Sequence, residues 1–150
     1  MTLVIGVGNT LRSDDGLGVR VAEEIQKLKL KDVEVLTSRG ENIDLLTLWK
    51  GYRRVVILDA MESHSKEPVK VFFAHAEPLP AAFEKTSTHG MGPLECIELA
   101  RALGELPPYL AVIGIAGKNF EIGESLTEKA TQAIPKAIQI FSTLLGGTHA

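Results

Sequence analysis

The N-terminal stretch of the chain constrains its fold more than any other, because it joins an apolar strand to a glycine-rich loop and two acids. The run Leu3–Ile5 is fully apolar, which is typical of a strand covered on both faces. Gly6 and Gly8 permit a tight turn and a close approach of the backbone. Asp14 and Asp15 precede a helical pattern, and either carboxylate could cap that helix. The sequence therefore predicts a strand–loop–helix unit. In open α/β sheets, ligands bind at the carboxyl end of such a strand.

The rest of the sequence alternates apolar strands with amphipathic helices. Helices are predicted over 17–28, 43–49 and 93–103 and from 125 to the C-terminus, and further strands over 33–37, 55–58, 69–73 and 109–115. This alternation favours a parallel sheet with right-handed crossovers. The strand over 55–58 is expected to end at Asp59.

The strand predicted over Val69–Phe73 breaks the alternation, because the polar segment 61–68 is too short for a parallel crossover. We therefore expect this strand to run antiparallel, at or near an edge. The long segment 74–90 must then carry the chain back across the sheet, and a loop of such length is commonly functional. The predicted fold is a three-layer α/β/α arrangement with a five-stranded, mostly parallel twisted sheet and helices on both faces, as a single domain over 1–150.

The two C-terminal helices carry their own signals. Pro93 suits the first turn of one helix and Gly104 its end. The apolar stripe of that helix is predicted to be Cys96, Leu99, Ala100 and Leu103. Residues 125–128 match a capping box at the start of the last helix, which Pro135 is expected to kink or split.

Composition excludes several classes of protein. A net charge of -3 and the lack of a basic run argue against a nucleic-acid partner. The single cysteine excludes an internal disulfide, so a reducing, cytoplasmic compartment is expected. The sequence shows neither a secretory signal nor an apolar run of the roughly 20 residues that a membrane helix needs, so no membrane partner is expected.

The glycine-rich loop is a poor match to a nucleotide-binding loop. Leu11 stands where a dinucleotide fingerprint has its third glycine, and the acids at 14 and 15 would repel a pyrophosphate. The loop also lacks the Gly-Lys-Ser/Thr ending of a phosphate loop. We expect no nucleotide cofactor.

The acids favour a metal instead. Asp15 lies just past the first strand, Asp59 closes the third strand at the same edge, and the long loop can deliver His89 there. Two carboxylates and an imidazole can hold a divalent ion such as zinc, nickel or manganese with positions left open. Open positions are what a hydrolytic metal needs. Asp15, Asp59 and His89 are therefore the candidate catalytic and metal-contacting residues.

Plainer roles compete with this hypothesis. Asp15 alone is more simply a helix cap, Asp59 a solvated strand end and His89 a surface histidine. His64 and His75 are alternative ligands that more simply decorate the surface.

Other polar residues carry weaker signals. Glu62 is ambiguous, and Arg39 and Glu41 either line a groove at the same edge or are solvated. Cys96 fits a buried structural thiol better than a nucleophile. Ser87 lacks the G-x-S-x-G context of a serine hydrolase.

With these residues in view, the sequence resembles the hydrogenase maturation endopeptidases, which act on nickel–iron hydrogenases. The resemblance covers nearly the whole chain. It rests on 6–18 (GVGNTLRSDDGLG), 56–60 (VILDA), 87–90 (STHG) before the helix at Leu94-Glu95, 113–115 and 123–127. The first of these motifs is the most specific.

The resemblance implies a concrete activity. Such proteins remove a short C-terminal peptide from the hydrogenase large-subunit precursor after nickel insertion, so the resemblance implies an aspartyl-type or metal-dependent endopeptidase. Their metal-contacting residues match Asp15, Asp59 and His89, and the first position varies between Asp and Glu in the family. The implied ion is nickel supplied by the substrate, with zinc or cadmium as substitutes in vitro, and we expect a monomer. The segment 116–120 departs from the family pattern, which bears on substrate preference.

Two hypotheses compete with this one. The chain could be a non-enzymatic metal- or nucleotide-binding α/β module, which tight nucleotide binding would favour. It could also be a peptidase for another substrate.

Overall fold

The computed structural model describes residues 1–38, 44–62, 67–80, 92–123 and 125–147. Its strands are β1 (Thr2–Val7), β2 (Val33–Ser38), β3 (Arg54–Glu62), β4 (Val69–Phe73) and β5 (Tyr109–Gly117). They form one five-stranded sheet in the order β2-β1-β3-β5-β4. β1, β2, β3 and β5 are parallel, and β4 pairs antiparallel with β5 at the edge of the sheet. The predicted antiparallel edge strand is confirmed.

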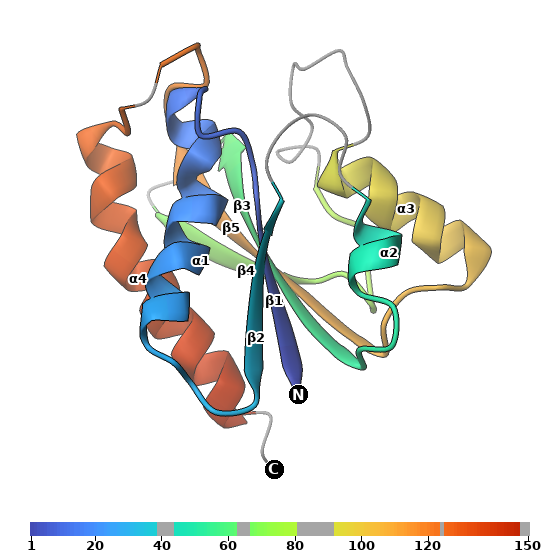
Figure 1. Ribbon diagram of the computed structural model, residues 1–150. Coiled ribbons are helices and arrows are strands. Elements are labelled where there is room, and N and C mark those ends of the chain that lie inside the picture. Colours follow the sequence, from blue (N-terminus) through green and yellow to red (C-terminus); the bar gives the residue numbers. More distant parts are fainter. Residues whose placement is uncertain (39–43, 63–66, 81–91, 124, 148–150) are drawn as a thin grey trace.

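Helices cover both faces of the sheet, so the three-layer prediction is also confirmed (Figure 1). α1 (Leu17–Lys27) and α4 (Glu128–Gly147) lie on one face, and α2 (Leu45–Leu48) and α3 (Pro93–Leu103) on the other. Each face has its own hydrophobic core: Val4, Leu58 and Phe141 belong to the first, and Ile5, Ile57 and Ile97 to the second. None of the described helices is long and apolar enough to cross a bilayer.

Two glycines let α1 approach the sheet at backbone distance. A Cβ at Gly18 would lie 2.1 Å from the carbonyl oxygen of Leu58, and a Cβ at Gly6 would lie 2.5 Å from that of Gly18. No side chain fits these positions, since real Cβ atoms do not come within 3.0 Å of backbone atoms. The close contact fixes the start of α1, and with it the 3-10 turn η1 (Ser13–Gly16), against β1 and β3.

β3 continues past Asp59 to Glu62, so the prediction that this strand ends at Asp59 is wrong. The reason is its neighbour: β5 runs to Gly117 and pairs with β3 throughout, with Asp59 opposite Gly114 and Glu62 opposite Gly117. Asp59 is fully buried within the strand rather than solvated at its end.

The sequence patterns of α3 and α4 were partly misleading. In α3 the buried face is formed by Pro93, Cys96, Ile97 and Ala100. Leu99 and Leu103 are exposed, because the helix turns its Ile97 side to the core. In α4 the helix runs through Pro135 without dividing, held by buried residues before and after it such as Ala133 and Ala137.

The start of α4 also differs from the capping box. The helix begins at Glu128, and the hydroxyl of Thr127, not that of Ser125, accepts a hydrogen bond from the Ala130 N–H at 3.3 Å.

Candidate active site

Two of the three predicted site residues lie at the carboxyl edge of the parallel strands. Asp15 belongs to η1, which follows the end of β1 and contacts β3. Asp59 belongs to β3, one residue beyond Leu58, which pairs with Gly6 of β1. Strand alternation places Asp59 on the same face as Ile57 and Met61, the face that α3 covers. Both aspartates are buried, Asp59 fully and Asp15 with 8% of its surface exposed.

The Asp15 carboxylate is held by the glycine-rich loop. Its Oδ2 accepts a hydrogen bond from the Asn9 N–H at 2.9 Å. The Asn9 side chain in turn accepts from the Leu11 N–H at 2.9 Å. Gly8 adopts φ +141°, and a Cβ there would lie 2.0 Å from the Asp15 carbonyl oxygen. The loop therefore wraps closely around η1 and points a backbone donor at Asp15.

Asp14 has a different role, although it is adjacent to Asp15. Its Oδ2 accepts hydrogen bonds from the N–H groups of Lys118 at 2.7 Å and Asn119 at 3.0 Å and from the Thr127 hydroxyl at 2.8 Å. Its Oδ1 accepts from the Thr127 N–H at 2.8 Å. Burial opposes ionisation of this carboxyl, but the bonds from Thr127, Asn119 and Lys118 outweigh it and lower the pKa of Asp14. Asp14 is thus an ionised structural anchor.

Neither acid caps α1, contrary to the sequence-based alternative. The cap position of α1 is Gly16, which has no side chain to accept a bond. Adjacent side chains of η1 diverge, so Asp14 turns toward the start of α4 and Asp15 toward Asn9. Only the tertiary structure separates these two aspartates.

Backbone hydrogen bonds reinforce the anchor. The Ser13 N–H donates to the Gly123 carbonyl at 2.6 Å, and the Gly123 N–H donates to the Leu11 carbonyl at 2.7 Å. The Asp14 N–H donates to the Asn119 carbonyl at 2.8 Å. We call these bonds, with those of the Asp14 carboxylate, the clasp. The clasp joins the loop after β1 to the segment between β5 and α4, a contact that the sequence did not predict.

His89, the third predicted site residue, lies outside the described residues. Within the part of the chain that the structure describes, no three His, Cys, Asp or Glu side chains group closely enough to hold an ion. The three-residue site therefore stays a prediction.

His75 is not an alternative ligand at this edge. It follows β4, whose antiparallel direction carries it to the amino end of β5. There its Nδ1 accepts from the Leu110 N–H at 3.0 Å and its ring stacks on Tyr109. His64, the other alternative, lies outside the described residues.

Of the weaker candidates, Cys96 is 2% exposed on α3 and burial raises the pKa of its thiol, as expected of a structural cysteine. Glu62 is exposed at the end of β3. Arg39, Glu41 and Ser87 lie outside the described residues.

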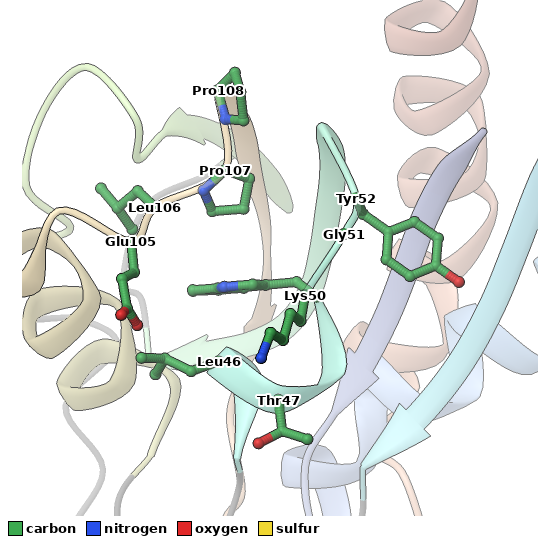
Figure 2. A pocket seen from close by; sticks show the side chains of 10 residues that line it. Leu46, Thr47, Lys50, Gly51, Tyr52, Glu105, Leu106, Pro107 and Pro108 are labelled. Atoms are coloured by element: carbon green, nitrogen blue, oxygen red, sulfur yellow. The ribbon is translucent and has the colours of Figure 1, made fainter.

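A cleft of about 460 Å³ lies away from the aspartates, at the amino end of the sheet. Lys50, just before β3, lies on one side of the cleft, and Glu105 and Pro107, just before β5, lie on the other, whereas the Tyr52 side chain points away from them (Figure 2). A shallow groove of about 610 Å³ lies between β4 and the end of α4. Neither pocket includes Asp15 or Asp59.

A family model described as hydrogenase maturation protease matches residues 19–143. The chain belongs to the hydrogenase maturation protease family. It is 31% identical over 140 residues to the hydrogenase 2 maturation protease of Escherichia coli (strain K12), an alignment that covers 91% of this chain and 85% of that protein.

Solved structures agree with the sequence comparison. The hydrogenase maturating endopeptidase HybD from E. coli superposes with a TM-score of 0.78 at 27% identity, over 98% of this chain and 93% of that one. A [NiFe] hydrogenase maturation protease HybD from Thermococcus kodakarensis gives a TM-score of 0.70 at 25% identity, over 95% and 97%. This member of the hydrogenase maturation proteases is accordingly an endopeptidase, a hydrolase. The alternative hypothesis of a non-enzymatic binding module is therefore wrong.

Proposed function

We propose that this maturation protease removes the C-terminal extension of a nickel–iron hydrogenase large-subunit precursor after nickel insertion. Membership of the hydrogenase maturation protease family carries the proposal. The position of Asp15 and Asp59 at one edge of the sheet supports it, since open α/β sheets bind their substrates at this edge. We place the reaction in the cytoplasm and assign it to the monomer.

Asp15, Asp59 and His89 are proposed to contact the nickel that the precursor carries. Carboxylate oxygens and an imidazole nitrogen are suitable donors for a divalent transition ion, and two of these donors are buried at the same edge. When bound, such an ion supplies Lewis-acid polarisation of a carbonyl or of water. Zinc or cadmium would serve as substitutes in vitro.

The direction of α3 supports the inclusion of His89. The end of α3 leads into the amino end of β5, which is parallel to β3, so α3 runs back from the carboxyl edge. Pro93 begins α3 shortly after His89 in the sequence. The start of α3 therefore lies toward the edge that holds Asp15 and Asp59.

The protein's own residues have distinct parts in this proposal. The buried Asp59 contributes a fixed carboxylate from a central strand, which allows little reorientation. Asp15 contributes a second carboxylate whose Oδ2 is oriented by the Asn9 N–H. Their burial keeps both charges in a poorly solvated place, where they interact strongly with a cation.

Mass spectrometry of a purified precursor tests the proposal. The wild-type protease should shorten the nickel-loaded precursor at its C-terminus and leave the nickel-free precursor intact. Asp59→Asn is preferred to alanine because Asp59 is buried inside β3, and an isosteric amide leaves the packing unchanged. Asp15→Asn, Asp59→Asn and His89→Ala should each lower processing by at least about a hundredfold, since each removes a group at the reacting centre.

Asp32→Asn is the matched control, because Asp32 lies before β2, at the amino end of the sheet, and Asn tolerates its φ of 60°. It should process at the wild-type rate. Cleavage of the nickel-free precursor without added metal would contradict the role of the ion, and cleavage of neither precursor would contradict the proposed substrate.

A further inference from the structure

We propose that Asp14 is a positioning residue, which fixes the orientation of Asp15 by anchoring η1 to the segment before α4. The inference rests on the proposed role of Asp15. It adds a third acid to Asp15 and Asp59, one that contacts neither substrate nor ion.

The first observation is that both oxygens of the Asp14 carboxylate are hydrogen-bonded to a distant part of the chain. Both of its oxygens accept hydrogen bonds, from Lys118, Asn119 and Thr127. Asp14 is completely buried, and Gly117 leaves the space that its side chain occupies, since a Cβ there would lie 2.9 Å from the Asp14 Cβ. The four donor groups belong to three residues that are more than a hundred positions away in the sequence.

The second observation is that η1 begins in a strained conformation, which its own hydrogen bond from the Asp15 N–H to the Arg12 carbonyl and bonds from a distant segment hold together. Ser13, its first residue, has φ 50°, a left-handed value that costs a non-glycine residue roughly 1 kcal/mol. The Ser13 N–H is held by the Gly123 carbonyl, and the next N–H, that of Asp14, by the Asn119 carbonyl. A strained turn persists when its surroundings impose it. Here the hydrogen bonds of the clasp help to impose the strained turn, and those to the Asp14 carboxylate are its side-chain bonds.

The third observation links this turn to the proposed catalytic carboxylate. Asp15 is the next residue, and its Oδ2 accepts from the Asn9 N–H. If η1 relaxes, Asp15 rotates away from Asn9, because its side-chain direction follows the turn. The Asn9 amide, which bonds to Asp15 and not to Asp14, therefore reports on the position of Asp15 independently of Asp14.

Amide hydrogen exchange measured by NMR tests the inference without using the substrate. In Asp14→Asn an NH₂ group replaces one acceptor oxygen in the clasp. Thr127→Val weakens the clasp from the other side and is the second variant should Asp14→Asn fail to fold. Each variant should speed exchange of the Asn9 amide at least about tenfold, while the Val21 and Ile25 amides of α1 stay within about twofold. Thr127→Ser, which retains the hydroxyl, should restore slow exchange at Asn9.

A processing assay gives the functional counterpart. Both variants should lower kcat about 10- to 100-fold with KM within about twofold, since a small misplacement of a group at the reacting centre has this effect. Asp32→Asn should change neither the exchange nor the rate.

The outcomes separate this inference from the proposed function. Unchanged exchange at Asn9, or equal acceleration at all amides, would show that Asp14 only supports the fold and would overturn the inference. If the wild-type protein fails to process the precursor, the proposed function fails, while Asn9 exchange still decides whether Asp14 positions Asp15.

Discussion

Asp14 and Thr127 are joined by two hydrogen bonds of 2.8 Å, one from the Thr127 N–H and one from its hydroxyl, although the residues are 113 positions apart. Thr127 is also the residue whose hydroxyl accepts from the Ala130 N–H at the start of α4. One pair of side chains thus ties the loop after β1 to the first turn of the last helix. The anionic carboxylate also lies at the helix N-terminus, which favours negative charge.

Thr127→Val should destabilise the protein by about 1–2 kcal/mol, because the isosteric change removes a donor to a buried carboxylate and a helix-capping acceptor. Thr127→Ser keeps the hydroxyl, so its loss of stability should be only a small fraction of that of Thr127→Val. Urea unfolding followed by circular dichroism measures both. Equal midpoints for the valine variant and the wild type would show that neither bond contributes.

Gly18→Ala should be severely destabilising, by about 3 kcal/mol or more, because the added Cβ would lie 2.1 Å from a backbone oxygen of β3 that cannot move aside. Gly146→Ala, in α4, is the control, since no atom lies within 4 Å of its added Cβ. Alanine favours helix over glycine, so this control should be neutral or stabilising. Thermal melting of the two variants compares them directly, and a Gly18→Ala protein that melts like the wild type would refute the close packing of α1.

Asp44 should make stability depend on acid pH. Its carboxylate accepts from the Thr47 hydroxyl at 2.6 Å and the Thr47 N–H at 3.2 Å, and these bonds lower the pKa of Asp44. The pKa of Asp44 is lower in the folded state than the unfolded value of 3.8. The stabilisation that ionised Asp44 gives to the folded protein is therefore complete above pH 3.8 and is lost as the pH falls through the folded-state pKa. Asp44→Asn retains a capping oxygen but does not titrate.

The comparison therefore uses urea midpoints of the wild type and Asp44→Asn at neutral pH and at several values below pH 3.8. The wild type should be the more stable at neutral pH, and the difference should shrink on acidification. A difference that stays constant or grows would contradict the assigned hydrogen bonds.

The thiol of Cys96 should react slowly with a disulfide reagent in the folded protein. The side chain is 2% exposed, and burial raises the pKa of Cys96, so both access and the thiolate fraction are low. At pH 8 we expect labelling at least about a hundredfold slower than in urea-unfolded protein. Rapid labelling of the native state would place Cys96 at the surface of α3.

The path of the chain could be predicted from local patterns. Apolar runs such as Val55–Leu58 are typical of covered strands, and the short polar link before Val69 disfavours a parallel crossover. Errors appeared where a neighbour decided the outcome. β3 extends through Asp59 because β5 pairs with it, and α3 buries Ile97 rather than Leu99 because of the orientation in which it packs.

The sequence by itself determined the order of strands and helices along the chain, the antiparallel edge strand and the edge at which Asp15 and Asp59 lie, because each follows from short-range periodicity and chain length. Only the tertiary structure decided that Asp14 is an anchor while Asp15 faces Asn9. Two identical neighbouring side chains have the same local preferences. Their roles differ because Thr127, Lys118 and Asn119 arrive from a distant segment and bond to one of them.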